Sequence, residues 1–187
     1  MATGSIILIN GASSAGKTTL VRAFQTIAPV PFVRFSFDLF LDGNALPMDF
    51  IRANQAAWTQ MRPHVFAGMH QCLHALVSTG NNVICDHIIE NAHWRNDLVS
   101  RLHGLDVYVV ALHCGLAELE RREQARGNRN PGEAANDLAV VHQGMHYDLE
   151  LDSEHATAPQ NAHHLITMWQ ARQPTARAFT RLMATPS

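Results

Sequence analysis

Short apolar runs and longer segments of helical periodicity alternate along the chain. Short apolar runs of this kind are typical of strands that are buried on both faces of a sheet. We therefore expect five strands, at Ser5–Asn10, Pro31–Phe37, Asn82–Asp86, Asp106–Cys114 and Asp148–Asp152.

The segments between these runs place apolar residues three and four positions apart, as helices that bury one face do. Helices are expected at Thr19–Ala28, Phe50–Thr79, Ala92–Leu102, Leu116–Arg126, Gly132–His146 and Pro159–Gln173. The longest of them is expected to break near Pro63, because proline cannot donate a backbone hydrogen bond. The tail from Pro174 to Ser187 is expected to form a packed terminal helix, with a frayed end as the alternative.

This alternation of strands and helices predicts an α/β fold. Right-handed crossovers would join the strands into a five-stranded parallel sheet with helices on both faces, giving three α/β/α layers. The 187 residues, 47% of them hydrophobic, are enough for one sizeable core. A single domain over residues 1–187 is therefore expected.

The charge balance narrows the class of partner. There are 14 basic and 16 acidic side chains, and the formal net charge is −2, so the chain has no overall field that would attract nucleic acid or an anionic membrane. Chemistry on a small molecule is favoured, and the oligomeric state stays open. No segment has the pattern of a signal peptide or membrane span, so the cytoplasm is the expected location.

The sequence GASSAGKT, residues 11–18, follows the first apolar run and matches the pattern G-x-x-x-x-G-K-[ST]. Backbone N–H groups at a helix N-terminus favour negative charge, so this segment is expected to cradle the α- and β-phosphates of a nucleotide. Lys17 is expected to reach the β- and γ-phosphates, and Thr18 to ligate Mg²⁺. The order of strand, loop and helix indicates a P-loop NTPase fold rather than a turn with incidental glycines. The expected nucleotide-binding residues are Gly11, Ala12, Ser13, Ser14, Ala15, Gly16, Lys17, Thr18 and Thr19.

Two aspartates lie where apolar runs end. In a parallel sheet, ligands bind beside these carboxyl ends of the strands. Asp86 ends VICD and is expected to hold Mg²⁺ beside Thr18, with a loop-ordering carboxylate as the alternative. Asp38 ends FSFD and is expected to accept the proton of an acceptor hydroxyl, with a helix N-cap as the alternative. Asp42 is a rival base, although a solvated loop position is favoured for it.

The segment RREQARGNRNPG, residues 121–132, is strongly basic in a chain with few charges. We expect it to belong to a small lid, at about residues 121–135, that closes over the nucleotide. Arg126 and Arg129 are expected to stabilise charge on the transferring phosphoryl group, and Arg122 to contact the nucleotide.

The alternative for these arginines is a solvated helix face. In that interpretation they pair with the neighbouring carboxylates Glu118, Glu120 and Glu123. For Arg121 this alternative is favoured.

Four stretches together resemble the chloramphenicol phosphotransferase family. They are IILINGASSAGKTTLVRAFQ, the FxxD that ends at Asp38, the ARGNR around Arg126 and Arg129, and VVHQGMHYDLELD at residues 140–152. The resemblance spans most of the chain and implies a P-loop kinase that moves the γ-phosphate of ATP to a hydroxyl of the antibiotic. It implies that Asp38 is the general base, that residues 11–18 hold ATP and that the arginine segment is the lid.

The resemblance also implies that residues 140–152 form a helix-to-strand junction near the nucleotide. His142 and Tyr147 lie in that stretch and are interpreted as packing residues.

The segment that follows Asp38 does not match the drug-binding region of chloramphenicol phosphotransferase. The sequence therefore leaves the identity of the phosphate acceptor open. An apolar wall for a moderately hydrophobic hydroxyl compound is expected from Phe37, Phe40, Leu41, Met48, Phe50 and Trp58. Ordinary core packing is the alternative for each of them.

Histidines and cysteines do not indicate a metal centre. His70 with His74, and His142 with His146, have the one-turn spacing that places two imidazoles on one helix face, but no third ligand is evident. The three cysteines, Cys72, Cys85 and Cys114, are odd in number and two lie in or beside apolar runs, which favours buried, reduced thiols.

The leading hypothesis is an O-phosphotransferase that uses ATP and Mg²⁺, with chloramphenicol or a related antibiotic as a candidate acceptor. A nucleoside kinase or another metabolite kinase would need the same parts. A third hypothesis is a nucleotide-dependent switch that acts on a protein partner, against which the base at Asp38 and the arginine lid both argue.

Overall fold

The computed structural model describes residues 3–126, 132–173 and 178–184. At its centre is a parallel sheet of five strands in the order β2-β3-β1-β4-β5, so the predicted sheet is confirmed. The strands are β1 (Ser5–Asn10), β2 (Val33–Ser36), β3 (Val83–His87), β4 (Asp106–His113) and β5 (Leu149–Asp152).

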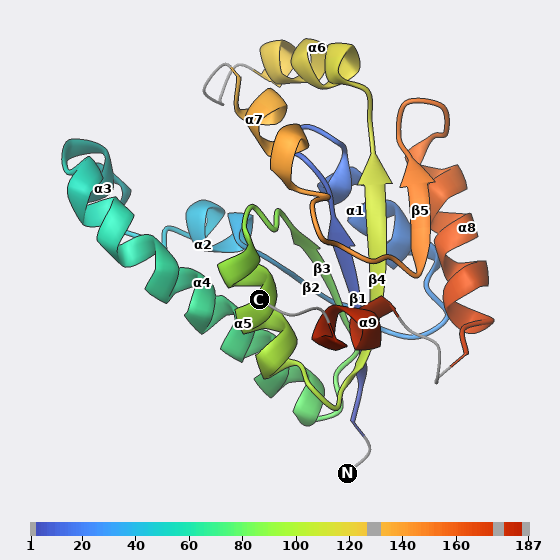
Figure 1. Cartoon of the computed structure of the whole chain (residues 1–187). Helices are drawn as coiled ribbons and strands as arrows, with labels where there is room; N and C mark the ends of the chain where they lie inside the picture. Colours follow the sequence, from blue (N-terminus) through green and yellow to red (C-terminus); the bar gives the residue numbers. More distant parts are fainter. Residues whose placement is uncertain (1–2, 127–131, 174–177, 185–187) are drawn as a thin grey trace.

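Helices cover both faces of this sheet, as the predicted three layers require (Figure 1). One face carries α1 (Lys17–Ile27) and α8 (Ala158–Gln170), which pack against each other. The opposite face carries α4 (Gln55–Ser78), α5 (Ala92–Arg101) and α9 (Ala178–Ala184). Beyond the carboxyl ends of the strands lie α6 (Leu116–Arg126) and α7 (Glu133–Val140).

The alternation of side chains along β1 explains why both faces are covered. Ile6 and Leu8 point into the core beneath α4, α5 and α9, whereas Ile7 and Ile9 point into the core beneath α1 and α8. All four side chains are fully buried. A strand that is apolar on both faces is stable only between two layers of helices.

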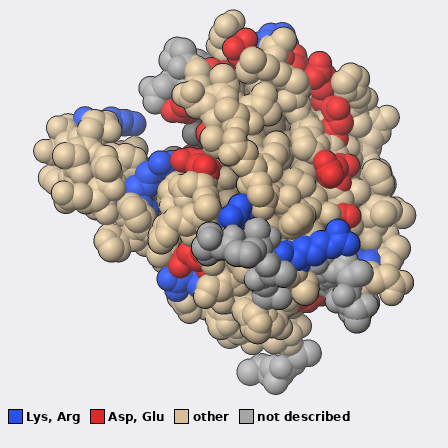
Figure 2. All heavy atoms as spheres, in the orientation of Figure 1, with Lys and Arg blue, Asp and Glu red and all other residues tan. Residues whose placement is uncertain are grey.

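Two short helices precede α4, namely α2 (Asp38–Asp42) and α3 (Met48–Ala53). Together, α3 and the start of α4 project from the body of the molecule (Figure 1). In the space-filling view this projection stands apart from the body, with a hollow between them, and charged side chains are scattered over the face that is shown (Figure 2).

The expected helix break near Pro63 is wrong, because α4 runs through Pro63 and the interruption lies at Asn54. Beyond Pro63, α4 buries an apolar series against the sheet: Phe66, Met69, Leu73 and Val77. Burial of such side chains contributes about 1.5–3 kcal/mol each, which outweighs one lost backbone hydrogen bond.

The helix expected at Gly132–His146 is shorter than predicted, because α7 ends at Val140. The chain then turns, with Gly144 at a φ of 65°, a value that glycine adopts readily. His142 and His146 therefore do not share a helix face. The terminal helix is present as α9, where Phe179 and Leu182 are buried.

The cysteines are free thiols, and Cys85 and Cys114 are buried as expected. The expectation of burial is wrong for Cys72, which is exposed on α4. Within the described ranges, no helix is long and apolar enough to cross a membrane.

Asn10, the last residue of β1, holds the end of the strand in place. Its fully buried amide donates to the Val141 carbonyl at 2.7 Å and to the Tyr147 hydroxyl at 2.9 Å, and it accepts from the Ile89 N–H at 3.0 Å. His142 contacts the same hydroxyl at 2.7 Å, so His142 and Tyr147 both support this junction. Three segments distant in sequence thus meet where the loop after β1 begins.

Replacing Asn10 with alanine is expected to lower the free energy of unfolding by about 3 kcal/mol, because it leaves a buried N–H group and a buried carbonyl without partners. Urea denaturation measures this change. The control is Gln143→Ala, which removes a side-chain hydrogen bond at the surface and should change stability by less than about 0.5 kcal/mol. Equal losses in both variants would contradict the structural role of Asn10.

Candidate functional site

Residues 11–18 form a tight loop between β1 and α1, which we call the phosphate loop. A Cβ atom at Gly11 would lie 2.6 Å from the Leu112 carbonyl oxygen, so only glycine fits at this position beside β4. Gly16 has a φ of 90° and Ser14 a φ of 62°, both in the left-handed region. The buried Ser14 hydroxyl has no hydrogen-bond partner. A strained loop with an unsatisfied donor beside a helix N-terminus is suited to binding an anion.

Lys17 lies inside the loop rather than at its surface. Its ammonium group donates to the carbonyl oxygens of Gly11 at 2.8 Å and Ala12 at 2.6 Å. Only 9% of the residue is exposed. The positive charge is therefore held where the loop would receive phosphate groups.

Thr18 and Asp86 meet as the sequence predicted. The Thr18 hydroxyl donates to Asp86 Oδ2 at 2.7 Å, across the contact between α1 and β3. The other carboxylate oxygen, Oδ1, is buried and has no hydrogen-bond partner. A hydroxyl and a carboxylate with a spare oxygen are hard donors of the kind that Mg²⁺ prefers, so these residues fit a magnesium site.

Asp38 lies two residues beyond β2, at the first turn of α2. It lines the same cavity as Lys17, Thr18 and Asp86. We call this cavity, of about 400 Å³, the central pocket. The candidate base and the phosphate loop therefore face one space.

The far wall of the central pocket is aromatic. Phe37 stacks on Phe66 with ring centroids 4.6 Å apart, and Phe66 stacks on Trp94 at 4.0 Å. The Arg62 guanidinium lies 4.7 Å from the centre of the Trp94 ring and forms an ion pair with Glu90. Burial raises the pKa of Glu90, and the charge of Arg62 opposes this shift.

The predicted apolar wall is divided between two cavities. Phe37 and Trp58 line the central pocket, whereas Leu41, Met48 and Phe50 line a second cavity of about 880 Å³. Phe40 lines neither of these cavities and packs on the core beside Phe35. Both cavities include Thr18 and Asp38, so they meet at the candidate reaction centre.

Two buried imidazoles, those of His87 and His70, form a hydrogen-bonded chain that begins at the wall of the central pocket, which His87 lines. The Ile88 N–H donates to His87 Nδ1 at 2.8 Å, so neutral His87 carries its proton on Nε2. That proton points to His70 Nε2 at 2.9 Å, and His70 Nδ1 then donates to Asp97 at 2.7 Å. Burial lowers the pKa of His87 well below its ordinary value, and His70 and Lys17 act in the same direction. Burial also lowers the pKa of His70, and Asp97 offsets part of that shift.

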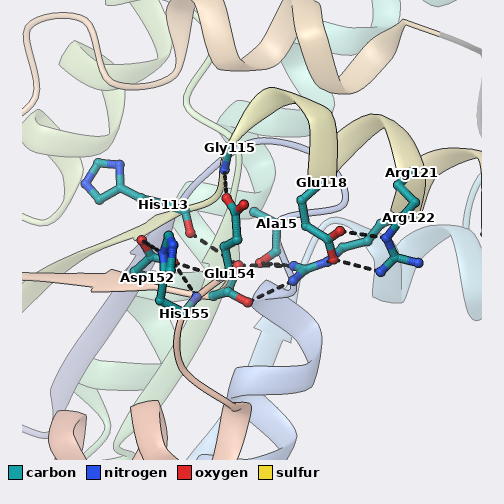
Figure 3. Close-up of polar contacts among 10 residues, drawn as sticks. Ala15, His113, Gly115, Glu118, Arg121, Arg122, Asp152, Glu154 and His155 are labelled. Carbon is teal, nitrogen blue, oxygen red and sulfur yellow. Dashed lines mark hydrogen bonds and ion pairs between the residues drawn. The ribbon is translucent and has the colours of Figure 1, made fainter.

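Arg122 connects α6 to the phosphate loop (Figure 3). Its guanidinium donates to Glu118 at 2.7 Å, to the Ser153 carbonyl at 2.8 Å and to the Ala15 carbonyl at 3.5 Å. Arg121 pairs with Glu118 at 2.6 Å, which is the solvated helix face expected for it.

The region expected to be the lid is anchored by Glu123. This buried carboxylate accepts from the backbone N–H groups of Gly132 and Ala134, both at 2.8 Å, so it caps α7. Asp137, one turn further along α7, accepts from the Ser13 N–H of the phosphate loop at 2.9 Å. Arg126, at the end of α6, lines the central pocket, whereas Arg129 lies outside the described residues.

A third cavity, of about 480 Å³, lies on the other side of the phosphate loop. It shares Ser14, Gly16 and Arg126 with the central pocket, and Thr19 and Arg122 also line it. Its apolar wall is formed by Leu20, Leu112, Ala125, Ala156 and Ala158. A flat, partly apolar group attached to a phosphate on the loop would fit here.

Several residues that line the central pocket, or that pack directly behind its wall as Trp94 does, were not predicted from the sequence. Phe66, Trp94 and the Arg62–Glu90 pair lie on helical segments that were interpreted as cover for the sheet, or just before them. His87 directly follows Asp86 in a strand-like run, and that position was the available signal. No group of three or more histidine, cysteine or acidic residues able to hold a metal occurs within residues 3–126, 132–173 and 178–184.

Comparison with known proteins identifies a family and two proteins of similar sequence. The chloramphenicol phosphotransferase-like protein family matches residues 4–170. Two Mycobacterium tuberculosis proteins, from strains CDC 1551 and H37Rv and each named "Putative O-phosphotransferase", are 32% identical to the chain over 201 residues. The matches cover 97% of this chain and 89% of each relative.

Solved structures share the fold. APS kinase CysC of Mycobacterium tuberculosis, in complex with AMPPNP and APS, has a TM-score of 0.68 and 17% identity, covering 91% of this chain and 99% of that one. Shikimate kinase of Acinetobacter baumannii, in complex with shikimate, has a TM-score of 0.60 and 14% identity, covering 90% and 94%. The predicted P-loop NTPase fold is thereby confirmed.

The buried imidazoles predict how stability depends on pH. The folded-state pKa values of His70 and His87 lie below the ordinary value of 6.5, so below about pH 6.5 the unfolded chain binds protons that the folded chain does not. The contribution of these histidines to the free energy of unfolding is therefore fully present above about pH 6.5. Below that pH the free energy of unfolding falls, by up to about 1.4 kcal/mol per pH unit for each histidine.

Urea unfolding between pH 7.5 and 5.0 measures this slope, and His70→Gln should flatten it. The control is His155→Gln at the surface, because Asp152 raises the pKa of His155 and gives that residue the opposite sign. An unchanged slope in His70→Gln would contradict the assignment of a neutral His70.

Proposed function

The chain belongs to the chloramphenicol phosphotransferase-like family, as its motifs predicted, and from this premise we propose that it transfers the γ-phosphate of ATP to a hydroxyl group of a small molecule. That the chain is an enzyme of the small-molecule kinase class follows from the family. We propose in addition that ATP is the phosphoryl donor, that Mg²⁺ is the metal and that the acceptor is a small hydroxyl compound.

One observation carries the proposal. Asp38, a carboxylate suited to general-base work, lines the same 400 Å³ pocket as Lys17 and Thr18 of the phosphate loop. A phosphoryl donor on the loop and a hydroxyl beside Asp38 would therefore face each other without a conformational rearrangement of the sheet.

We assign the nucleotide to the phosphate loop and the third cavity. The triphosphate lies on the loop amides and Lys17, and the base lies against the apolar wall beyond Gly16, where Arg122 is held. Thr18 and Asp86 would hold Mg²⁺, which when bound neutralises charge on the β- and γ-phosphate oxygens. Residues 121–135 would cover the nucleotide as a lid.

In the proposed reaction the acceptor hydroxyl donates to Asp38. As its oxygen bonds to the γ-phosphorus, its proton passes to the Asp38 carboxylate, and the bond between the γ-phosphorus and the bridging oxygen breaks to release ADP. Lys17 and Arg126 stabilise the charge that develops on the transferred group, and Arg129 is proposed to act with them.

The aromatic wall is the part of the central pocket that would contact the body of the acceptor. Chloramphenicol is the first acceptor to test, because it gives the family its name. A panel of other hydroxyl compounds, nucleosides among them, tests the metabolite-kinase alternative. Stabilisation of the protein against heat by an acceptor in the presence of a non-hydrolysable ATP analogue identifies ligands before any assay of transfer.

Asp38→Asn is expected to leave ATP binding within about twofold of the wild type and to lower phosphoryl transfer at least about a hundredfold, because the amide cannot accept the proton. Calorimetry measures ATP binding, and a coupled assay for ADP with an active acceptor measures transfer. Asp42→Asn is the matched control, since Asp42 is exposed at the end of α2, and it should retain transfer within a few-fold. A rate of phosphoryl transfer in Asp38→Asn equal to that of the wild type would contradict the assignment of Asp38 as the base.

Lys17→Ala is expected to weaken ATP binding by about tenfold or more and to abolish turnover, because it removes a charge-assisted contact to the phosphates. Calorimetry with ATP and Mg²⁺ measures the loss. Wild-type protein that gives no heat with any triphosphate would refute the proposed function altogether. Nucleotide-dependent capture of a protein, with every hydroxyl acceptor inactive, would favour the switch instead.

A further inference from the structure

Beyond Thr18, Asp38 and Arg126, the residues that line the second cavity have no role in the proposed transfer of phosphate. This cavity is a groove of about 880 Å³ between α1 and the α2–α3 segment, and it reaches Thr18 and Asp38 at its inner end. Four arginines line it, Arg22, Arg34, Arg52 and Arg126, and we call it the arginine groove. We propose that this groove binds an anionic group of the acceptor, such as a carboxylate or a phosphate ester. The proposal rests on the proposed function and specifies its substrate class.

Arg34 is the residue that points to an anion. Its side chain is only 16% exposed, yet its Nε is buried without a hydrogen-bond partner. The nearest carboxylate oxygen, Asp86 Oδ1, is 3.8 Å from Nε and is itself unsatisfied, so this is a loose ion pair and not a hydrogen-bonded one. The Ser36 hydroxyl lies 3.4 Å from Nη2, at the limit of a hydrogen bond. A mostly buried guanidinium with so few contacts is energetically costly. An anion in the groove would offset this cost by binding the guanidinium.

The magnesium site strengthens this argument. Asp86 is the carboxylate nearest to Arg34, and it is also the residue that fits Mg²⁺ beside Thr18. A cation held by Asp86 would compensate the charge of that carboxylate, and the Arg34 guanidinium would then lack its nearest anion. An anionic group on the acceptor would take that place, with the planar donors that guanidinium offers to carboxylates and phosphates.

The opposite walls of the groove differ in charge, which places the anion. Arg34 from β2 and Arg22 from α1 form one wall, and Arg22 is one helical turn after Thr18 on the same face of α1. The other wall comes from α2 and α3 and carries Asp42 and Asp49, of which Asp49 is paired with Arg52 at 3.6 Å. The anion is therefore bound on the wall of α1 and β2.

The position of Asp38 between the two cavities defines the acceptor further. The aromatic wall lies on one side of Asp38 and the arginine groove on the other. The acceptor class is thus an alcohol whose hydroxyl-bearing carbon lies between an apolar or aromatic group and an anionic group. A hydroxy acid with an aromatic substituent is a simple compound of this class.

Matched pairs of alcohols that differ in one anionic group test the proposal. The pairs are 3-phenyllactate with 1-phenylpropan-2-ol, 4-hydroxybutyrate with butan-1-ol, and glycerol 3-phosphate with glycerol. Calorimetry measures their binding to the full-length protein with a non-hydrolysable ATP analogue and Mg²⁺. The anionic member of at least one pair is expected to bind at least tenfold more tightly, and added salt should reduce this preference. No preference for the anionic member in any pair would overturn the proposal.

Three variants identify the wall that binds the anion. Arg34→Leu should remove most of the preference and leave binding of the neutral member unchanged, whereas Arg34→Lys should retain part of it. Arg22→Leu should have a smaller effect, because Arg22 is exposed. Arg95→Leu is the control, since it removes the same charge from α5, outside the groove. If Arg34→Leu weakened both members of a pair equally, Arg34 would act only through Asp86 and the proposal would be wrong.

The same measurements separate this proposal from the proposed function. If the protein binds the ATP analogue and phosphorylates neutral alcohols without preferring anionic ones, only the anion site is refuted. If it binds no nucleotide at all, the proposed function fails, and with it the inference that depends on it.

Discussion

The hydrogen bond between Thr18 and Asp86 is the contact on which the arrangement of the site depends. It joins the first turn of α1 to β3, and it is possible because β1 and β3 are neighbours whose residues Ile9 and Asp86 lie in register. On the next strand, Ser36 lies in register with Asp86, and Asp38 follows two residues later. The loop, the carboxylate and the candidate base are therefore brought to one level of the sheet by the pairing of three parallel strands.

Around this level the candidate reacting groups and the cavities that would bind substrates occupy different places. The polar residues Lys17, Thr18, Asp38 and Asp86 occupy the middle, and cavities of different character surround them. One wall is aromatic, another carries arginines, and a third offers a partly apolar space beside the phosphate loop. Such a layout would allow substrate preference to change through helices α2 to α4 while the strands keep the candidate reacting groups in place.

Buried polar side chains stabilise the segments that surround this site. Asn10 holds the end of β1 in place, His70 accepts the Nε2 proton of His87, and Glu123 caps α7 beside the phosphate loop. Each satisfies groups on another segment of the chain, and a buried donor or acceptor without its partner would be costly. Sequence patterns showed little sign of these roles: Glu123 was considered only as a carboxylate that could pair with arginines on a solvated helix face, and His70 only as half of a possible metal-binding pair with His74.

By itself, the sequence determined the five parallel strands, the phosphate loop and the positions of Asp38 and Asp86, because these follow from local periodicity, glycine positions and the ends of apolar runs. The sequence did not predict, or predicted wrongly, the features that depend on contacts between segments distant in the chain. Packing against the sheet carried α4 through Pro63, stacked Phe66 between Phe37 and Trp94, and left Arg34 beside Asp86 with an unsatisfied nitrogen. Only the tertiary structure decided these features, because burial and hydrogen-bond partners depend on which strands and helices become neighbours.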